Sequence, residues 1–339
     1  MSDAIFPACH VQLPPYTEGY RAAFYLAAEE FISQNLPKEN YLFTWQIGPT
    51  VVMGRNQDAY SEIDRDFCIN EKIDIIRRKS GGGCIYADYG NIMISLITGG
   101  GSVESLFSEY ALYISKLLNL LGADVEVTGR NDIIIKEKGK VCGNAFYHLP
   151  DRNIIHGTML YDTNIQLMNK ALTPEKAKLH SKKVKSVGSR VGFLKEVLHE
   201  GIGTKEIREY IIKGLTNRTI CLTDEQVKQI KEIEKNYYKN DYLWGEKSIP
   251  TQLVTCTNRI EKCGNITLKF NISEKRIISA DLSGDYFETG DSRQAFENAF
   301  KNQSFDKIVL KKIASKQNLH TNIRGLSLND LQNILNQIP

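Results

Sequence analysis

The sequence predicts an α+β protein, with a mixed or antiparallel sheet in a large N-terminal domain and a second, smaller α+β domain after it. Helical and strand-like periodicities both occur, and most segments between neighbouring strands are too short for the helical crossovers of a doubly wound parallel sheet. Around Trp244–Pro250 a helix-rich stretch gives way to new strand-like runs. The 339 residues therefore suit one large and one small domain, which we place at residues 1–245 and 246–339.

The chain begins with an amphipathic helix over about residues 18–35. Apolar residues recur in it at the spacing that places them on one helical face: Tyr20, Ala23, Phe24, Ala27 and Phe31. Short strand-like runs follow: Tyr41–Gln46, Thr50–Gly54, Ile73–Ile76, Cys84–Tyr86 and Asn91–Ile97. Gly48-Pro49 separates the first two runs, and we expect the last two to pair with each other around a turn at Asp88–Gly90.

A second long helix is expected over about residues 103–121, and helices dominate residues 164–236. Between them four strands stand close together: Val125–Val127, Ile133–Ile135, Lys140–Tyr147 and Ile154–Leu160. The small domain should contain three strands and helices near residues 291–300 and 326–337. The three strands are expected at Gln252–Thr257, Asn265–Phe270 and Ile277–Leu282.

Composition excludes several classes of protein. Hydrophobic residues make up 42% of the chain, enough for a buried core, and a net charge of +3 does not argue for nucleic acid. No signal peptide is apparent, and no apolar run approaches the ~18 residues that span a membrane. The seven cysteines are scattered without a C-x-x-C pair, which is typical of reduced thiols and does not favour zinc. We expect a soluble cytoplasmic protein.

The segment Arg77-Arg78-Lys79-Ser80-Gly81-Gly82-Gly83 directly follows a predicted strand. Consecutive glycines can adopt positive φ, and their N–H groups can surround a phosphate. The arginines and lysine supply positive charge, and an arginine can bind two phosphate oxygens at once. The order of residues matches neither a P-loop nor a dinucleotide fingerprint. Taken alone, the segment fits a charged turn equally well.

Further along, Asn131 and Asp132 lie between two predicted strands. Asp132 could bind Mg²⁺, which prefers one or two carboxylates together with phosphate oxygens, whereas Asn131 by itself fits an Asx turn. Lys140 begins a strand whose neighbours are small, with Gly143 three residues on. It is either a solvated edge lysine or a fixed charge facing a carbonyl and a phosphate.

Two later segments carry further polar groups. In His156-Gly157-Thr158, Gly157 allows a close approach and Thr158 offers a hydroxyl, while a lone histidine in a strand is usually structural, so that His156 receives a supporting role. Residues 182–191 are basic and contain serines. They form either a solvated helix entry or a lid that closes on an anion.

Taken together, these segments resemble the lipoate–protein ligases over most of residues 20–200. The likeness lies in their order along the chain: RRKSGGG at 77–83, Gly90-Asn91, GRND at 129–132, GKVCGNA at 139–145, HGTML at 156–160 and KVKSVGSRV at 183–191. The C-terminal part is similar to the accessory domain of these enzymes, notably at Arg259, Gly264-Asn265-Ile266 and Ser283–Phe287. The resemblance implies a catalytic domain of the biotin and lipoate ligase type, with that accessory domain appended.

The resemblance also implies a two-step reaction. Lipoate and ATP give lipoyl-adenylate and pyrophosphate, and the lipoyl group then passes to a lysine of a lipoyl domain of a 2-oxoacid dehydrogenase E2 subunit or of the glycine-cleavage H protein. By resemblance, Lys140 is the catalytic residue and Asp132 faces Mg²⁺. The remaining residues that the resemblance assigns to ATP and lipoyl-adenylate are Arg78, Ser80, Gly81, Gly82, Gly83, Cys84, Ile85, Tyr86, Asn131, Gly143, His156, Thr158, Lys185, Ser189 and Arg190.

Three alternatives stay open. An ATP-independent octanoyl or lipoyl transferase could carry the acyl group on Cys142, since a nearby lysine would favour the thiolate. A biotin ligase is not favoured, because the G-R-G-R and K-W-P-N-D stretches typical of that family have no counterpart in this chain. A binding scaffold without catalysis would not require Arg78, Asp132 and Lys140 together.

Overall fold

The computed structural model describes residues 6–100, 102–128, 132–172, 191–245 and 253–338. The chain divides into two compact units. The first comprises residues up to 53, 59–78 and 85–243, and the second comprises residues 54–58, 79–84 and 244–339. The α+β class expected from the sequence is confirmed. The expected boundary at 245/246 adjoins residues outside the described ranges and stays a prediction.

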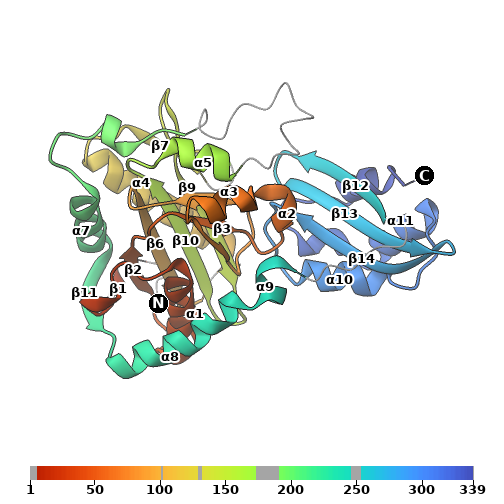
Figure 1. Cartoon of the computed structure of the whole chain (residues 1–339), viewed down its shortest axis with the longest axis horizontal. Helices are drawn as coiled ribbons and strands as arrows, with labels where there is room; N and C mark the ends of the chain where they lie inside the picture. Colours follow the sequence, from red (N-terminus) through yellow and green to blue (C-terminus); the bar gives the residue numbers. More distant parts are fainter. Residues whose placement is uncertain (1–5, 101, 129–131, 173–190, 246–252, 339) are drawn as a thin grey trace. The chain divides into compact units, whose positions relative to one another are not determined.

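The first unit contains two sheets with helices around them (Figure 1). Its strands are β1 (Ala8–Gln12), β2 (Tyr41–Trp45), β3 (Thr50–Met53), β4 (Asp74–Arg77), β5 (Ile85–Ala87), β6 (Asn91–Thr98), β7 (Val125–Thr128), β8 (Asp132–Ile135), β9 (Gly139–His148), β10 (Asn153–Leu160) and β11 (Thr216–Cys221). Its helices are α1 (Ala22–Asn35), α2 (Ala59–Glu62), α3 (Arg65–Asn70), α4 (Val103–Leu120), α5 (Ile165–Ala171), α7 (Thr204–Leu215), α8 (Asp224–Glu234) and α9 (Asn240–Trp244), the last of which ends in the second unit.

The large sheet has eight strands in the order β11-β1-β2-β6-β10-β9-β8-β7. Strand β1 is parallel to both β11 and β2, and the other neighbours are antiparallel, so the sheet is mixed. A small sheet has the order β4-β3-β5. The sequence pattern did not predict β1 or β11. Strand β11 is largely exposed, and its partner lies about 200 residues earlier in the chain, so neither periodicity nor local context marks it.

One predicted pairing was wrong. Strands β5 and β6 do not pair around the turn at Asp88–Gly90, because β5 pairs with β3 in the small sheet. Both edges of β6 are occupied by β2 and β10, and all eight of its residues are buried. The turn therefore carries the chain from one sheet to the other.

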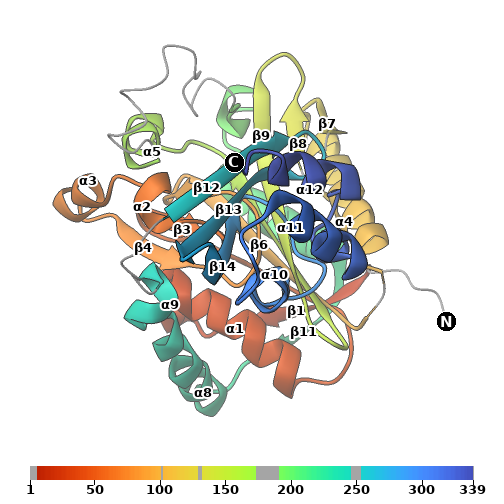
Figure 2. The same cartoon turned by 90° about the vertical axis from the view of Figure 1, so that its right-hand side faces the viewer.

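Helices cover the two faces of the large sheet. On one face lies α1, which is buried all round over Ala22–Ile32, and the ring of its Tyr25 stacks on Trp45 of β2 with centroids 4.6 Å apart. On the other face lie α4, whose Phe107 meets Phe146 of β9, and α7. In Figure 2, α1 and α4 lie on different sides of these strands.

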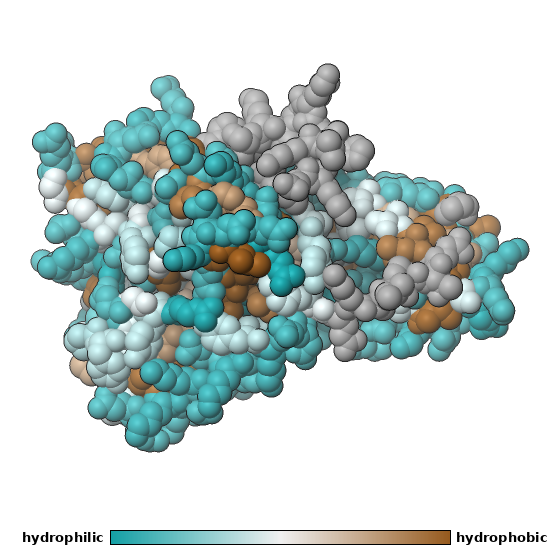
Figure 3. All heavy atoms as spheres, viewed as in Figure 1, coloured by the Kyte–Doolittle hydropathy of each residue, from teal (hydrophilic) through white to brown (hydrophobic). Residues whose placement is uncertain are grey.

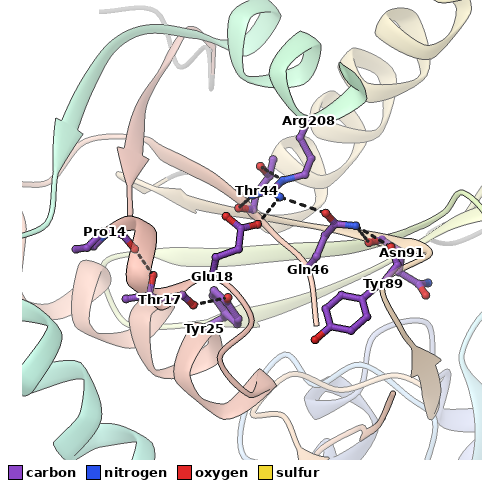
Figure 4. Close-up of polar contacts among 9 residues, drawn as sticks. All are labelled: Pro14, Thr17, Glu18, Tyr25, Thr44, Gln46, Tyr89, Asn91 and Arg208. Atoms are coloured by element: carbon purple, nitrogen blue, oxygen red, sulfur yellow. Dashed lines mark hydrogen bonds and ion pairs between the residues drawn. The ribbon is translucent and has the colours of Figure 1, made fainter. Parts of the chain in front are cut away.

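Arg208 of α7 ties this helix to the sheet (Figure 4). Its guanidinium donates to Thr44 Oγ1 at 3.1 Å and to Gln46 Oε1 at 3.2 Å, and it forms an ion pair with Glu18 at 2.9 Å. Gln46 Nε2 in turn donates to the carbonyl of Tyr89, in the turn before β6, at 2.8 Å. A cleft of ≈620 Å³ lies beside Arg208, and none of the predicted site residues lines it.

The second unit has its own core. Its elements are β12 (Leu253–Ile260), β13 (Gly264–Ser273), β14 (Arg276–Gly284), α10 (Ser292–Phe300), α11 (Lys307–Lys316) and α12 (Leu328–Leu335). Residues of β13 alternate between buried and half-buried, and the buried Phe270 meets Phe300 of α10 at 5.7 Å between centroids. One face of an antiparallel sheet is thus covered by helices, as the period-two pattern predicts.

Polar side chains cover most of the surface seen in Figure 3, and apolar residues occupy only small areas of it. Among the described residues, no helix is long and apolar enough to cross a membrane.

Candidate active site

A β-bulge decides which way Lys140 points. In the register of β8 and β9, Asp132 faces Gly143 and Ile133 faces Cys142, but Ile134 faces Lys140. Strand β9 therefore carries one extra residue, Val141, at this level. Strict alternation would give Lys140 and Cys142 the same face. The extra residue instead brings Lys140 to the face of Gly143 and away from α4.

The side chain of Lys140 lies over Gly143. A Cβ added at Gly143 would be 2.6 Å from Lys140 Cε and 2.7 Å from Nζ, so the space left by the glycine is filled by the lysine. The ammonium is 2.7 Å from Asp132 Oδ1, and both side chains are about one-third exposed, at 36% and 33%. The resemblance assigned Gly143 to the lipoyl-adenylate site; in this structure the Lys140 side chain lies in the space beside Gly143.

Two residues of β10 share this face. Thr158 stands opposite Gly143, and His156 stands opposite Ala145, two residues further along. His156 is buried, and its Nδ1 lies 3.1 Å from each carboxylate oxygen of Glu29. The supporting role expected for His156 agrees with this pairing.

Glu29 was not found from the sequence. It lies on α1 and is 3% exposed, and it also accepts a hydrogen bond of 2.5 Å from Ser95, to which Trp45 Nε1 donates at 2.9 Å. A buried carboxylate is costly unless it accepts hydrogen bonds. Ser95 donates to Glu29, and the His156 ring lies against the same carboxylate, so these side chains form a buried polar network with Trp45. The signal that could have revealed it is a glutamate inside an otherwise apolar helical stripe.

Cys142 and Gly157 belong to the opposite face, towards α4. Cys142 is completely buried, and burial raises the pKa of its thiol to about 12, with Lys140 acting only as a weaker opposing influence. A Cβ at Gly157 would lie 2.3 Å from Asn144 Oδ1. The expectation that Gly157 serves the approach of a ligand was wrong, because alternation in β10 turns it away from His156 and Thr158.

The two arginines before the glycines belong to the first unit. Arg77 is buried, and its Nε donates to the carbonyl of Leu243 at 3.1 Å. Arg78 is 5% exposed, and its Nη1 donates to the carbonyl of Val52 at 3.0 Å. The predicted contact of Arg78 with a phosphate is not tested by this bond, which holds one nitrogen of its guanidinium.

The glycines belong to the second unit. The amide of Gly82 donates to the carbonyl of Tyr286 at 3.0 Å, and a Cβ at Gly81 would lie only 2.4 Å from that oxygen. Gly82 has φ +87°, a conformation that favours glycine. Ser80 is buried, and its carbonyl accepts from the amide of Arg55 at 2.9 Å. At least one of the predicted anion-binding amides is thus engaged by the protein in this structure.

The other predicted ligand contacts differ in exposure. Cys84 and Ile85 are half-buried, whereas Tyr86 is only 2% exposed. Asn131, Lys185, Ser189 and Arg190 lie outside the described residues. Two residues after the end of the undescribed range 173–190, the amide of Gly192 donates to the carbonyl of Lys140 at 2.9 Å.

Comparison with known proteins decides the family. Residues 21–216 match the family model described as the lipoyl protein ligase A/B catalytic domain, and residues 253–335 match the bacterial lipoate protein ligase C-terminus. The chain belongs to the lipoate–protein ligase family. It is 33% identical to lipoate–protein ligase 1 of Staphylococcus aureus over 78% of this chain and 82% of that protein.

Solved structures of this family share the fold. LipL1 of P. falciparum, solved with lipoate, gives a TM-score of 0.77 at 17% identity and covers 97% of this chain and 99% of its own. A lipoate–protein ligase A solved with ATP gives a TM-score of 0.59 at 20% identity, over 70% of this chain and 99% of its own. The resemblance stated from the sequence motifs is therefore confirmed at the level of family and fold.

Proposed function

We propose that this protein is an ATP-dependent lipoate–protein ligase. It would activate lipoate as lipoyl-adenylate and then transfer the lipoyl group to a lysine of an E2 lipoyl domain or of the glycine-cleavage H protein. The family supports the class of reaction, and relatives solved with lipoate or with ATP support the two small-molecule substrates. The observation on which the proposal rests is the one-third exposed Lys140, which a bulge and a glycine hold on one face beside Asp132.

The proposed chemistry needs a fixed positive charge. When the carboxylate of lipoate attacks the α-phosphate, and when an amine later attacks the acyl carbonyl, negative charge builds up on phosphate and carbonyl oxygens. A lysine held in advance stabilises that charge without reorganisation. Lys140 has this character, since its side chain is supported along Gly143 while its ammonium stays accessible. Thr158, opposite Gly143, could donate its hydroxyl to the same ligand.

Asp132 suits a role beside Mg²⁺. Among the described residues no cluster of three or more His, Cys, Asp or Glu side chains could hold a metal ion alone. A single, partly exposed carboxylate does fit Mg²⁺ that is bound mainly through substrate phosphates. When bound, the ion would neutralise charge on those phosphates. In this structure Asp132 pairs with Lys140.

The transferase alternative is less well supported. A thioester carrier must reach its substrate and must ionise, but the Cys142 thiol is completely buried and its pKa is raised to about 12. Its Sγ donates to Asn144 Oδ1 at 3.4 Å, on the face away from Lys140. Cys142 therefore behaves as a small core residue.

The decisive experiment is intact-mass analysis of a lipoyl domain after incubation with this protein, lipoate, ATP and Mg²⁺. We expect the acceptor to gain one lipoyl group only when ATP is present, with release of pyrophosphate. Transfer without ATP, from an acylated carrier protein, would instead support the transferase and would contradict the proposal.

Two lysine variants test whether Lys140 acts in adenylate formation. Lys140→Ala should lower kcat for pyrophosphate release by about 100- to 1,000-fold, whereas Lys136→Ala should leave it unchanged. Lys136 is a matched control, because it is an exposed lysine directly after the adjoining strand β8, where it forms an ion pair with Asp124. Pyrophosphate release by Lys140→Ala at the native rate would refute the role given to this lysine.

A further inference from the structure

Asn144 stands directly behind the candidate site. It is 2% exposed and lies on β9, next to Gly143 but pointing to the opposite face, towards α4. In the register of β9 and β10 it faces Gly157. On the other face, one residue along each strand, Gly143 faces Thr158. Asn144 and the support of Lys140 are therefore separated only by the thickness of the sheet.

The amide of Asn144 occupies the place of a side chain at position 157. A Cβ on Gly157 would lie 2.3 Å from Asn144 Oδ1, and 2.9 Å from Tyr110 Oη of α4. The Cys142 thiol donates to Asn144 Oδ1 at 3.4 Å and so holds the amide from within the same strand. Because a protein interior is close-packed, removing the Asn144 amide or adding a methyl group at Gly157 should displace the backbone of the two strands.

We propose that Asn144 is a positioning residue for Lys140, acting across β9 and β10 by filling the space over Gly157. This inference rests on the proposed role of Lys140 in adenylation. Loss of the amide would let the two strands shift at the level of Gly143, and Lys140 lies against that glycine within 3 Å of a Cβ position. Because Asn144 does not reach the site face, it should affect the rate of the chemical step and not the binding of lipoate.

Substitutions at positions 144 and 157 should compensate each other, and this allows a test. Gly157→Ala introduces a methyl group where Asn144 Oδ1 stands, and should lower kcat for pyrophosphate release by about 100-fold, the cost of a displacement of about 1 Å. Asn144→Ala should lower kcat by about tenfold while KM for lipoate stays unchanged. In the Asn144→Ala/Gly157→Ala double variant the new methyl fills the vacated space. Its kcat should return to that of Asn144→Ala or better.

Tyr110→Phe is the matched control. Within the described part of the chain the buried Tyr110 hydroxyl has no hydrogen-bond partner, so its removal should leave kcat unchanged. The inference is overturned if Gly157→Ala loses as much activity in the Asn144→Ala background as in the native one. It is also overturned if Asn144→Ala raises KM for lipoate with kcat intact, since Asn144 would then contact the substrate.

Melting temperatures of the native protein, Asn144→Ala, Gly157→Ala and the double variant separate this inference from the proposed function. Compensation in stability between positions 144 and 157 reports the contact itself, whatever the protein catalyses. If Lys140→Ala keeps full activity, the proposed role of Lys140 fails, and the positioning role of Asn144 fails with it even where the stabilities compensate. If Lys140→Ala is inactive and kcat shows no compensation, only the positioning role fails.

Discussion

Gly143→Ala adds one methyl group at the point where Lys140 rests. The new Cβ would lie 2.6 Å from Lys140 Cε and 2.7 Å from its Nζ, whereas carbon atoms in contact stay about 3.5 Å or more apart. The lysine must therefore move by about 1 Å, or leave Asp132 altogether. The backbone at Gly143 is not in the left-handed region, so alanine causes no strain of its own.

The expected consequence is a loss of rate without a comparable loss of stability. A misplacement of about 1 Å can cost about 100-fold in a reaction that depends on position. We expect kcat for pyrophosphate release to fall by about 10- to 100-fold on this basis. The methyl group meets a flexible, one-third exposed side chain, so the free energy of unfolding should change by less than about 1 kcal/mol.

Single-turnover release of pyrophosphate, with denaturant unfolding of the same protein, measures both quantities. The control is the double variant Lys140→Ala/Gly143→Ala. In that background the methyl group displaces nothing, so it should cost no further activity. The reasoning is refuted if Gly143→Ala keeps the native rate, or if the methyl group costs the same factor when Lys140 is absent.

Three further predictions follow from other contacts. Glu29→Ala should lower the free energy of unfolding by about 2–3 kcal/mol in denaturant titration, because it leaves His156 and Ser95 without their buried acceptor; an unchanged midpoint would contradict the buried network. The raised pKa of the Cys142 thiol gives stability that is fully present below its unfolded pKa and is lost as pH rises towards about 12. Cys142→Ser should therefore flatten the decline of stability above pH ~9, and an identical pH profile would show the thiol to be accessible. Gly81→Ala places a Cβ 2.4 Å from the carbonyl of Tyr286, and should lower the melting temperature by several degrees; an unchanged melting temperature would show that this contact gives way without cost.

Much of the fold was predictable because the signals are local. The apolar spacing in α1 and the alternation in β13 are patterns of neighbouring residues, and the structure forms both elements where the patterns stand. Only β13 buries a single face, because α1 is buried all round over Ala22–Ile32. Strand β11 was not predictable, since its exposed residues depend on a partner about 200 residues away. The supposed hairpin of β5 and β6 failed for a similar reason, because competition for the edges of two sheets decides the pairing.

The site divides in the same way. The sequence by itself determined the family and named Lys140, Asp132 and Gly143, because the order of short motifs along the chain is a one-dimensional property. It also set Cys142 two residues after Lys140, so that the lysine was expected to favour a Cys142 thiolate in the transferase alternative. Only the tertiary structure separated them, since the bulge at Val141 depends on how β9 pairs with β8. The tertiary structure also packs Asn144 over Gly157 and pairs His156 with Glu29. These contacts depend on strand register and on packing against helices, and no local sequence pattern records either.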